Sequence, residues 1–293
     1  MTPGGDSVLS QSAIDSMLLG QAHEAGPVPS PAAPAKPKEE ARSVLEVERI
    51  AAPVSTPTSR RPTGPSLVST GNPEVDKKIG GGLPAGSLTL VEGQSDAGKS
   101  VLSQQFIWGS LNSGMRVAVY TTENTTASLL RQMKSLSLDV LDFFLLARLN
   151  IYPVPNTFSS DRPQKVFDVL LSHISRLAGF QLFVVDSLTA FITHAPESET
   201  LDFFSRAKDI CDDNQTLIVT MHSYALDEQL LTRLSSLCDA HLRMRVEEVG
   251  DRLVKVLEVS KVRGAARSTG NIVSFDIEPN LGIRVIPINK AKA

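Results

Sequence analysis

The chain has 293 residues, of which 41% are hydrophobic and 21% charged, with a net charge of −3 and two cysteines. This composition supports a buried core, and the slight acidic excess gives no general attraction to nucleic acid. Cys211 and Cys238 lack the spacing typical of a metal site or a disulfide framework, so we expect reduced, partly buried thiols. There is no basic-then-apolar leader and no run of about 20 apolar residues, so we expect a cytoplasmic protein without direct membrane insertion.

The first 65 residues fall into two segments. In residues 1–20, Ser10 can cap a short helix that places Ile14, Met17 and Leu18 on one face. A helix of about ten residues is marginal in water, so we expect it to form on binding a partner. Residues 21–65 are rich in Pro, Ala, Ser, Lys and Glu, which predicts a disordered Pro-rich linker.

Residues 66–289 form the expected folded domain. Helices are expected at 73–79, 101–111, 126–137, 163–177, 201–213 and 226–236, and strands at 87–91, 116–122, 150–154, 181–185 and 216–220. Strands that alternate with helices predict an α/β fold with a central, mostly parallel sheet flanked by helices. Four further strands, at 240–247, 253–261, 271–277 and 283–288, predict a C-terminal antiparallel extension.

A phosphate-binding loop is predicted between the strand 87–91 and the helix 101–111. The residues expected to bind nucleotide are Gly93, Gln94, Ser95, Asp96, Ala97, Gly98, Lys99, Ser100 and Val101. The first eight fit the pattern G-x-x-x-x-G-K-S, in which the glycines let backbone N–H groups point at phosphate oxygens. Lys99 would contact the β- and γ-phosphates, and the Ser100 hydroxyl would bind Mg²⁺. The loop therefore predicts a bound nucleotide together with Mg²⁺.

Two acidic residues stand at the carboxyl ends of expected strands, which meet at the ligand crevice of such a sheet. Asp186 follows the strand 181–185 and fits a metal-binding carboxylate, with Ser187 beside it; alternatively it caps the next helix. Glu123 ends the strand 116–122 and could activate a water molecule as a general base. Alternatively, Glu123 stabilises the N-terminus of the following helix.

Three further residues are candidates for contact with the γ-phosphate. His222 follows the strand 216–220 and could sense the phosphate, or it is a polar surface residue. Lys261 and Arg263 end an expected strand too far along the topology to be assumed near their own loop. In a ring such a basic pair commonly reaches the neighbouring subunit's phosphate as an arginine finger does. The alternative is a solvated hairpin tip.

With these residues assembled, residues 68–288 resemble the RecA/KaiC superfamily. The similarity rests on Asp76–Gly86 (DKKIGGGLPAG), the phosphate-binding loop, Asp186 and Lys261–Gly264 (KVRG). More narrowly, the chain is similar to the FlaH (ArlH) family, the accessory ATP-binding proteins of the archaellum motor. This closer similarity is carried by Gly71, Asn72, Asp76, Ser95–Ser100, Thr121–Thr125, Gly270–Phe275, Gly282 and Ile283.

The resemblance implies a RecA-like fold and a homo-oligomer, in the form of a hexameric ring. It also implies a place at the membrane-associated motor base, alongside the motor ATPase and the membrane platform protein. Bound ATP would then act mainly as an assembly switch, with weak or no hydrolysis. Relatives that hydrolyse ATP readily carry paired glutamates where this chain has Glu123 and Asn124, which agrees with slow turnover.

Two other functions remain open. One is a KaiC-like signalling ATPase or autokinase with real turnover. A RecA-type DNA recombinase fits less well, because no basic stretch interleaved with aromatic residues is present to grip DNA.

The first twenty residues resemble a different family. Asp6–Gln11, Ile14, Asp15 and Leu18 are similar to the N-terminal helix of the bacterial flagellar motor switch proteins. That helix captures the phosphorylated chemotaxis response regulator, so residues 7–19 are expected to bind a response regulator. A flexible linker of about 45 residues would let this helix search about 35–40 Å from the folded domain.

Overall fold

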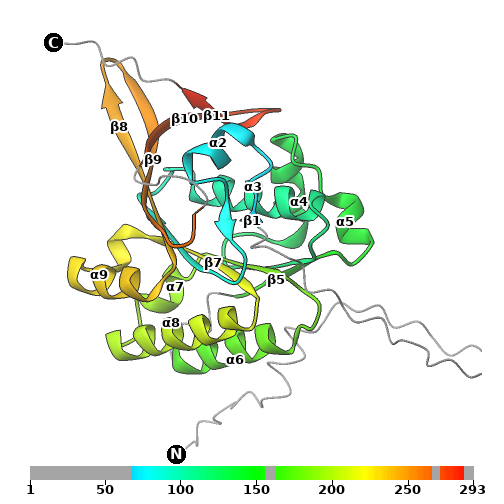
Figure 1. Ribbon diagram of the computed structural model, residues 1–293, viewed down its shortest axis with the longest axis vertical. Coiled ribbons are helices and arrows are strands. Elements are labelled where there is room, and N and C mark those ends of the chain that lie inside the picture. Colours follow the sequence, from blue (N-terminus) through cyan, green and yellow to red (C-terminus); the bar gives the residue numbers. More distant parts are fainter. Residues whose placement is uncertain (1–66, 156–162, 266–270, 287–293) are drawn as a thin grey trace, which may run out of the picture. The chain divides into compact units, whose positions relative to one another are not determined.

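The computed structural model describes residues 67–155, 163–265 and 271–286 (Figure 1). The expected partner-binding helix in residues 1–20 and the expected linker in residues 21–65 lie outside the described residues. Within the described ranges, no helix is long and apolar enough to cross a membrane. Cys211 and Cys238 are both buried, free thiols.

The described residues form a nine-stranded sheet with the strand order β11-β10-β9-β8-β3-β7-β6-β4-β5. The parallel strands are β3 (Leu88–Gly93), β4 (Val117–Thr121), β5 (Leu149–Pro153), β6 (Leu182–Asp186), β7 (Thr216–His222) and β8 (Ala240–Val249). The antiparallel strands are β9 (Arg252–Val262), β10 (Ile272–Glu278) and β11 (Gly282–Ile286). A separate antiparallel pair joins β1 (Leu67–Val68) to β2 (Leu83–Pro84). The predicted fold class is confirmed.

The position of β8 corrects one expectation from the sequence. The sequence predicts residues 240–247 as part of the antiparallel extension, but β8 lies parallel to β3, with Thr89 opposite Ala240 and Gly93 opposite Met244. The reason is the helix that connects β7 to β8, because a crossover through a helix returns the chain in the same direction. The antiparallel extension therefore begins with β9. Beyond Met244, β8 continues to Val249, past the end of β3.

Helices cover both faces of this sheet, as Figure 1 shows. One face packs against α2 (Pro73–Lys78), α3 (Lys99–Asn112), α4 (Thr126–Ser135) and α5 (Leu141–Leu145). The other face packs against α6 (Pro163–Arg176), α7 (Thr189–Ile192), α8 (Glu197–Asp212) and α9 (Glu228–Leu237). Since both faces are covered, strands such as β6 are buried at every residue, which explains their continuous apolar sequence.

The segment before α2 is fastened by one carboxylate. The hydroxyl of Ser69 donates to Asp76 at 2.5 Å, and the backbone N–H and the hydroxyl of Thr70 donate to the same carboxylate at 2.9 and 2.7 Å. Gly71 lies against Trp108 of α3 so closely that a Cβ atom at this position would sit 2.4 Å from the indole ring. These contacts dock the start of the domain onto the helix that follows the phosphate-binding loop.

The C-terminal extension packs on the same helix. A Cβ atom at Gly282 would lie 2.3 Å from the Gln105 amide of α3, so β11 approaches the helix closely. Asn72 caps α2 and also donates from Nδ2 to the carbonyl oxygen of Ile283 at 2.7 Å. Phe275 of β10 belongs to the buried cluster around α3. The extension therefore packs directly against α3.

Candidate nucleotide-binding site

The phosphate-binding loop joins β3 to α3, as predicted, with Gly93 as the last strand residue and Lys99 as the first helical residue. Gly93 has no room for a side chain, because a Cβ atom there would lie 2.0 Å from the Met244 carbonyl oxygen of β8. Gly98 has φ 96°, and a Cβ atom there would meet the side chain of Phe275 at 3.2 Å. Both glycines are thus required by close packing or by a left-handed backbone.

Lys99 is buried beneath this loop. Its ammonium group donates to the carbonyl oxygens of Gly93 at 3.1 Å and Gln94 at 2.6 Å. Burial lowers the pKa of Lys99, and the carboxylates of Glu123 and Asp186 only partly oppose that shift. The ammonium group would gain from further negative charge, which phosphate oxygens would supply.

Asp186 and Ser100 lie together, as the predicted metal site requires. The Ser100 hydroxyl donates to Asp186 Oδ1 at 3.3 Å, and the Thr220 hydroxyl of β7 donates to the same oxygen at 2.6 Å. Burial raises the pKa of Asp186 above its usual value, while the hydrogen bond from Thr220 opposes the rise. The alternative role does not fit, because α7 begins after Leu188 and no side chain caps it.

These oxygen atoms fit Mg²⁺, which prefers hard oxygen ligands and keeps several positions for water and substrate phosphate. A buried carboxylate with a raised pKa would also be stabilised by a cation. Among the described residues, no group of three or more His, Cys, Asp or Glu side chains could hold a metal ion. A metal ion bound by Ser100 and Asp186 would therefore depend on phosphate oxygens and water for its remaining ligands.

Glu123 lies at the same edge of the sheet, just after β4. Its Oε1 accepts a hydrogen bond from the Ser187 hydroxyl at 3.2 Å, which places it beside the residue that follows Asp186. The N-cap of α4 is Thr125 rather than Glu123, and the Asn124 side chain accepts a hydrogen bond from Ser128 at 3.0 Å. Glu123 is thus free for a role at the crevice, whereas Asn124 contributes to the start of α4.

His222 ends β7 directly opposite Gly93 of β3. Its backbone N–H donates to the Thr189 hydroxyl at 2.9 Å, and its ring lies parallel to that of Tyr224 with 5.2 Å between centroids. Burial, followed by the positive charge of Lys99, lowers the pKa of His222. The lowered pKa favours the neutral ring at pH 7, and the sensor role stays a prediction.

Lys261 and Arg263 lie away from this crevice. Lys261 pairs with His241 across β8 and β9, whereas Gly93 pairs with Met244, three residues (about 10 Å) further along β8. Both residues lie where β9 leads into its connection to the antiparallel neighbour β10, so a place in a solvated hairpin stays the alternative to a role across subunits. Lys261 donates to the carbonyl oxygen of Ser235, and Arg263 donates to that of Ser236 at 3.1 Å, at the end of α9.

Two site residues were not singled out in the sequence. Thr220 was placed in a strand without a role, although it donates a hydrogen bond to Asp186. Glu92 is a buried acid in the otherwise apolar and neutral stretch LTLVEG, directly before the loop. A charged residue within an otherwise apolar and neutral strand is unusual, so Glu92 could have been identified from the sequence. The contact of Thr220 follows only from the adjacency of β6 and β7.

Comparison with known proteins agrees with this geometry. A family model described as "ATPase: KaiC" matches residues 68–290. The archaeal flagellar ATP-binding protein FlaH of Sulfolobus acidocaldarius is 33% identical over 231 residues, covering 78% of this chain and 100% of that protein. The chain belongs to the FlaH family of KaiC-like ATPases. A FlaH of Methanocaldococcus jannaschii is 29% identical, covering 72% of this chain and 91% of that protein.

Solved structures support the same assignment to the FlaH family. The crystal structure of the flagellar accessory protein FlaH from Methanocaldococcus jannaschii matches with a TM-score of 0.65 and 27% identity, covering 76% of this chain and 100% of that one. A KaiC-like protein from Pyrococcus horikoshii shares the fold, with a TM-score of 0.63 at 22% identity and the same coverage. The family model begins at residue 68, so residues 1–67 lie outside the matched region.

Proposed function

We propose that this FlaH-family protein is the ATP-binding regulatory and assembly component of an archaellum-type rotary motor. The observation that carries the proposal is the arrangement of Lys99, Ser100 and Asp186 at one edge of the sheet. The chain also matches an archaeal FlaH over the full length of that FlaH. Lys99 would bind the β- and γ-phosphates, and Ser100 and Asp186 would bind Mg²⁺. The ion would neutralise phosphate charge.

ATP acts in this proposal as a switch with weak or no turnover. Hydrolysis needs a positioned base and groups that neutralise charge on the γ-phosphate. Glu123 is the one carboxylate in the loop after β4, because the next residue is Asn124. Lys261 and Arg263 do not reach the loop of their own chain, which supports a role across the contact with a neighbouring subunit. ATP would thereby stabilise a ring, for which we propose six subunits.

The ring would lie at the cytoplasmic base of the motor, alongside the motor ATPase and the membrane platform protein. Residues 66–289 would form the ATP-binding domain, with residues 21–65 as a linker. Residues 7–19 would recruit a phosphorylated response regulator. Comparing the full chain with one that lacks residues 1–20 tests this recruitment. Equal binding of the phosphorylated regulator to both chains would refute it.

The test of nucleotide binding is the variant Lys99→Ala. We expect it to weaken ATP–Mg²⁺ binding about a hundredfold, the effect of about 3 kcal/mol of charge-assisted hydrogen bonding. Lys134→Ala is the matched control, because that exposed lysine pairs only with Asp139 at 3.8 Å among the ion pairs of the described residues. Titration calorimetry with the full chain measures both. Equal affinities of Lys99→Ala and Lys134→Ala would contradict a nucleotide site at this loop.

A signalling ATPase or autokinase is the second candidate, favoured by the position of Glu123 beside the Ser187 hydroxyl and near Lys99. This function requires sustained phosphate release, which Glu123→Gln would abolish, or stable phosphorylation of a Ser or Thr. Phosphate release slower than assembly, with no phosphorylated residue detected by mass spectrometry, would favour the switch instead.

A further inference from the structure

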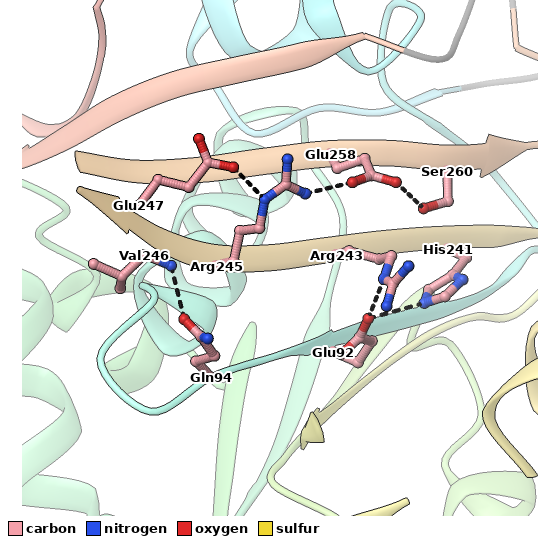
Figure 2. Close-up of polar contacts among 9 residues, drawn as sticks. All are labelled: Glu92, Gln94, His241, Arg243, Arg245, Val246, Glu247, Glu258 and Ser260. Carbon is pink, nitrogen blue, oxygen red and sulfur yellow. Dashed lines mark hydrogen bonds and ion pairs between the residues drawn. The ribbon is translucent and has the colours of Figure 1, made fainter. Parts of the chain in front are cut away.

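A cluster of charged groups around a buried carboxylate lies directly before the phosphate-binding loop, with the Arg243 side chain 48% exposed. Glu92, the residue before Gly93, is only 2% exposed. Arg243 of β8 donates from Nε to Glu92 Oε1 at 2.6 Å, and His241 Nε2 lies 3.7 Å from the same oxygen (Figure 2). The second separation is longer than a hydrogen bond, so Arg243 is the direct partner of Glu92.

Glu92 is ionised in this cluster. Burial by itself raises the pKa of Glu92, but His241 and Arg243 together lower it below its usual value. A full negative charge is therefore held at the base of a loop that has to bind a polyanion. The ammonium group of Lys99 is close enough to this charge to be affected by it. Without a compensating cation, the carboxylate would attract Lys99 and repel phosphate.

Arg243 supplies that cation from a strand that also holds the loop in place. The backbone N–H of Gln94 donates to the Met244 carbonyl oxygen at 3.2 Å, and Gln94 Oε1 accepts from the backbone N–H of Val246 at 2.9 Å. Figure 2 shows the Arg243 and Gln94 contacts side by side along β8. The first half of the loop is thus attached to β8 both by charge and by hydrogen bonds.

We propose that Arg243 is a positioning residue for nucleotide binding, which neutralises Glu92 so that Lys99 and the loop can accept a triphosphate. The inference rests on the proposed function, since it concerns the affinity of the same loop. Arg243 itself touches no phosphate in this scheme. Its effect is exerted through Glu92, so removing Glu92 should remove the need for Arg243.

Arg245 provides a matched control two residues along the same strand. It donates to Glu247 at 2.5 Å and to Glu258 of β9 (Figure 2). Both partners lie in the β8–β9 hairpin, and Arg245 has no ion pair to β3 among the described residues. Arg245→Gln therefore removes the same charge from the same strand without uncovering Glu92.

The experiment measures the ATP–Mg²⁺ affinity of the full chain for the unaltered protein and a set of variants. Arg243→Gln is expected to weaken binding about tenfold, equivalent to about 1.4 kcal/mol, and Glu92→Gln to tighten it about threefold. The double variant Glu92→Gln/Arg243→Gln should return to within about threefold of the unaltered chain, and Arg245→Gln should not differ from it. Thermal unfolding of each variant shows whether it is folded at the temperature at which the ATP affinity is measured.

Two readouts separate this role from a purely structural one. The loss caused by Arg243→Gln should be larger for ATP than for ADP, because repulsion grows with ligand charge, and Arg243→Lys should restore most of the affinity. Equal losses for both nucleotides, or ATP affinity of Arg243→Gln equal to that of the unaltered chain, would overturn the inference. If Arg243→Gln does not fold, a tenfold loss in the double variant would overturn it. No ATP binding by the unaltered chain would instead overturn the proposed function.

Discussion

The buried charge of Asp186 destabilises the fold, although the same charge is needed to bind a cation. Its carboxylate is buried and accepts hydrogen bonds from Thr220 and Ser100, yet burial raises its pKa. A folded-state pKa above the unfolded-state value means that ionisation destabilises the fold. This penalty is present at neutral pH and disappears as the pH falls and Asp186 becomes protonated. A bound cation would offset the same penalty.

We therefore expect Asp186→Asn to stabilise the chain in the absence of nucleotide. The amide oxygen can still accept from Thr220, and a gain of about 1 kcal/mol would raise the melting temperature by about 2–4 °C. The same variant should lose the Mg²⁺ dependence of ATP binding. Calorimetric unfolding and ATP titration with and without Mg²⁺ measure the two effects.

The control is Asp202→Asn, since Asp202 forms an exposed pair with Arg206 at 3.4 Å. Its melting temperature should change by less than a degree or so, because exposed pairs contribute about 0–1 kcal/mol. A lower melting temperature for Asp186→Asn than for Asp202→Asn would show that the buried carboxylate stabilises the fold.

Individual site residues could be predicted where the signal is contiguous or lies at a strand end. Gly93–Ser100 form a local pattern, Asp186 closes β6, and Glu123 lies two residues after the end of β4, so the sequence predicts that these residues lie at one edge. Thr220 and Arg243 carry no such local signal. Their roles depend on which strands are neighbours, and strand order is fixed by long-range packing that the sequence pattern does not encode.

At the scale of elements, α3 is the helix on which the domain is assembled. Gly109 in its second half lies against the segment before α2, and a Cβ atom there would sit 2.3 Å from the Ser69 carbonyl oxygen. Helix propensity alone favours alanine over glycine at this position by about 0.5–1 kcal/mol. Packing predicts that alanine destabilises the chain instead, because the backbone of α3 and that of the segment before α2 cannot move apart freely.

We expect Gly109→Ala to destabilise the chain by about 3 kcal/mol, as overpacking against backbone does. Gly114→Ala is the control, since no atom lies within 4 Å of its Cβ position; its left-handed φ of 93° should cost only about 1–2 kcal/mol. Urea unfolding measures both. A stabilised Gly109→Ala would show that the helix and the segment before α2 are not tightly packed.

Most elements of the domain could be predicted, but two kinds of information were missing. The sequence pattern predicts neither a helix nor a strand in residues 138–147, yet α5 forms there, and the side chains of Leu145 and Leu146 are about 70% exposed. Such a short apolar run without caps does not distinguish a helix from a loop. β8 was predicted as a strand but not as a parallel one, because the pattern of a strand does not reveal its partner.

At the scale of the whole molecule, the two groups of functional candidates lie toward opposite ends of the strands. The nucleotide residues lie at the carboxyl ends of β3, β4, β6 and β7, whereas Lys261 and Arg263 lie near the amino end of β8. Within one chain, the register separates Lys261 from the phosphate-binding loop by about 10 Å along the strands. This separation is the structural reason to expect that a complete site requires two chains, and hence that nucleotide binding and assembly are linked.

The most direct test of this account is the mass of the full chain in solution, measured by light scattering with and without ATP–Mg²⁺. We expect ATP–Mg²⁺ to convert the unaltered chain and Lys134→Ala to a ring-sized oligomer, and to leave Lys99→Ala unchanged. The linkage is reciprocal, so ATP should also bind more tightly at higher protein concentration. A mass that is the same with and without ATP–Mg²⁺ in the unaltered chain would contradict the account.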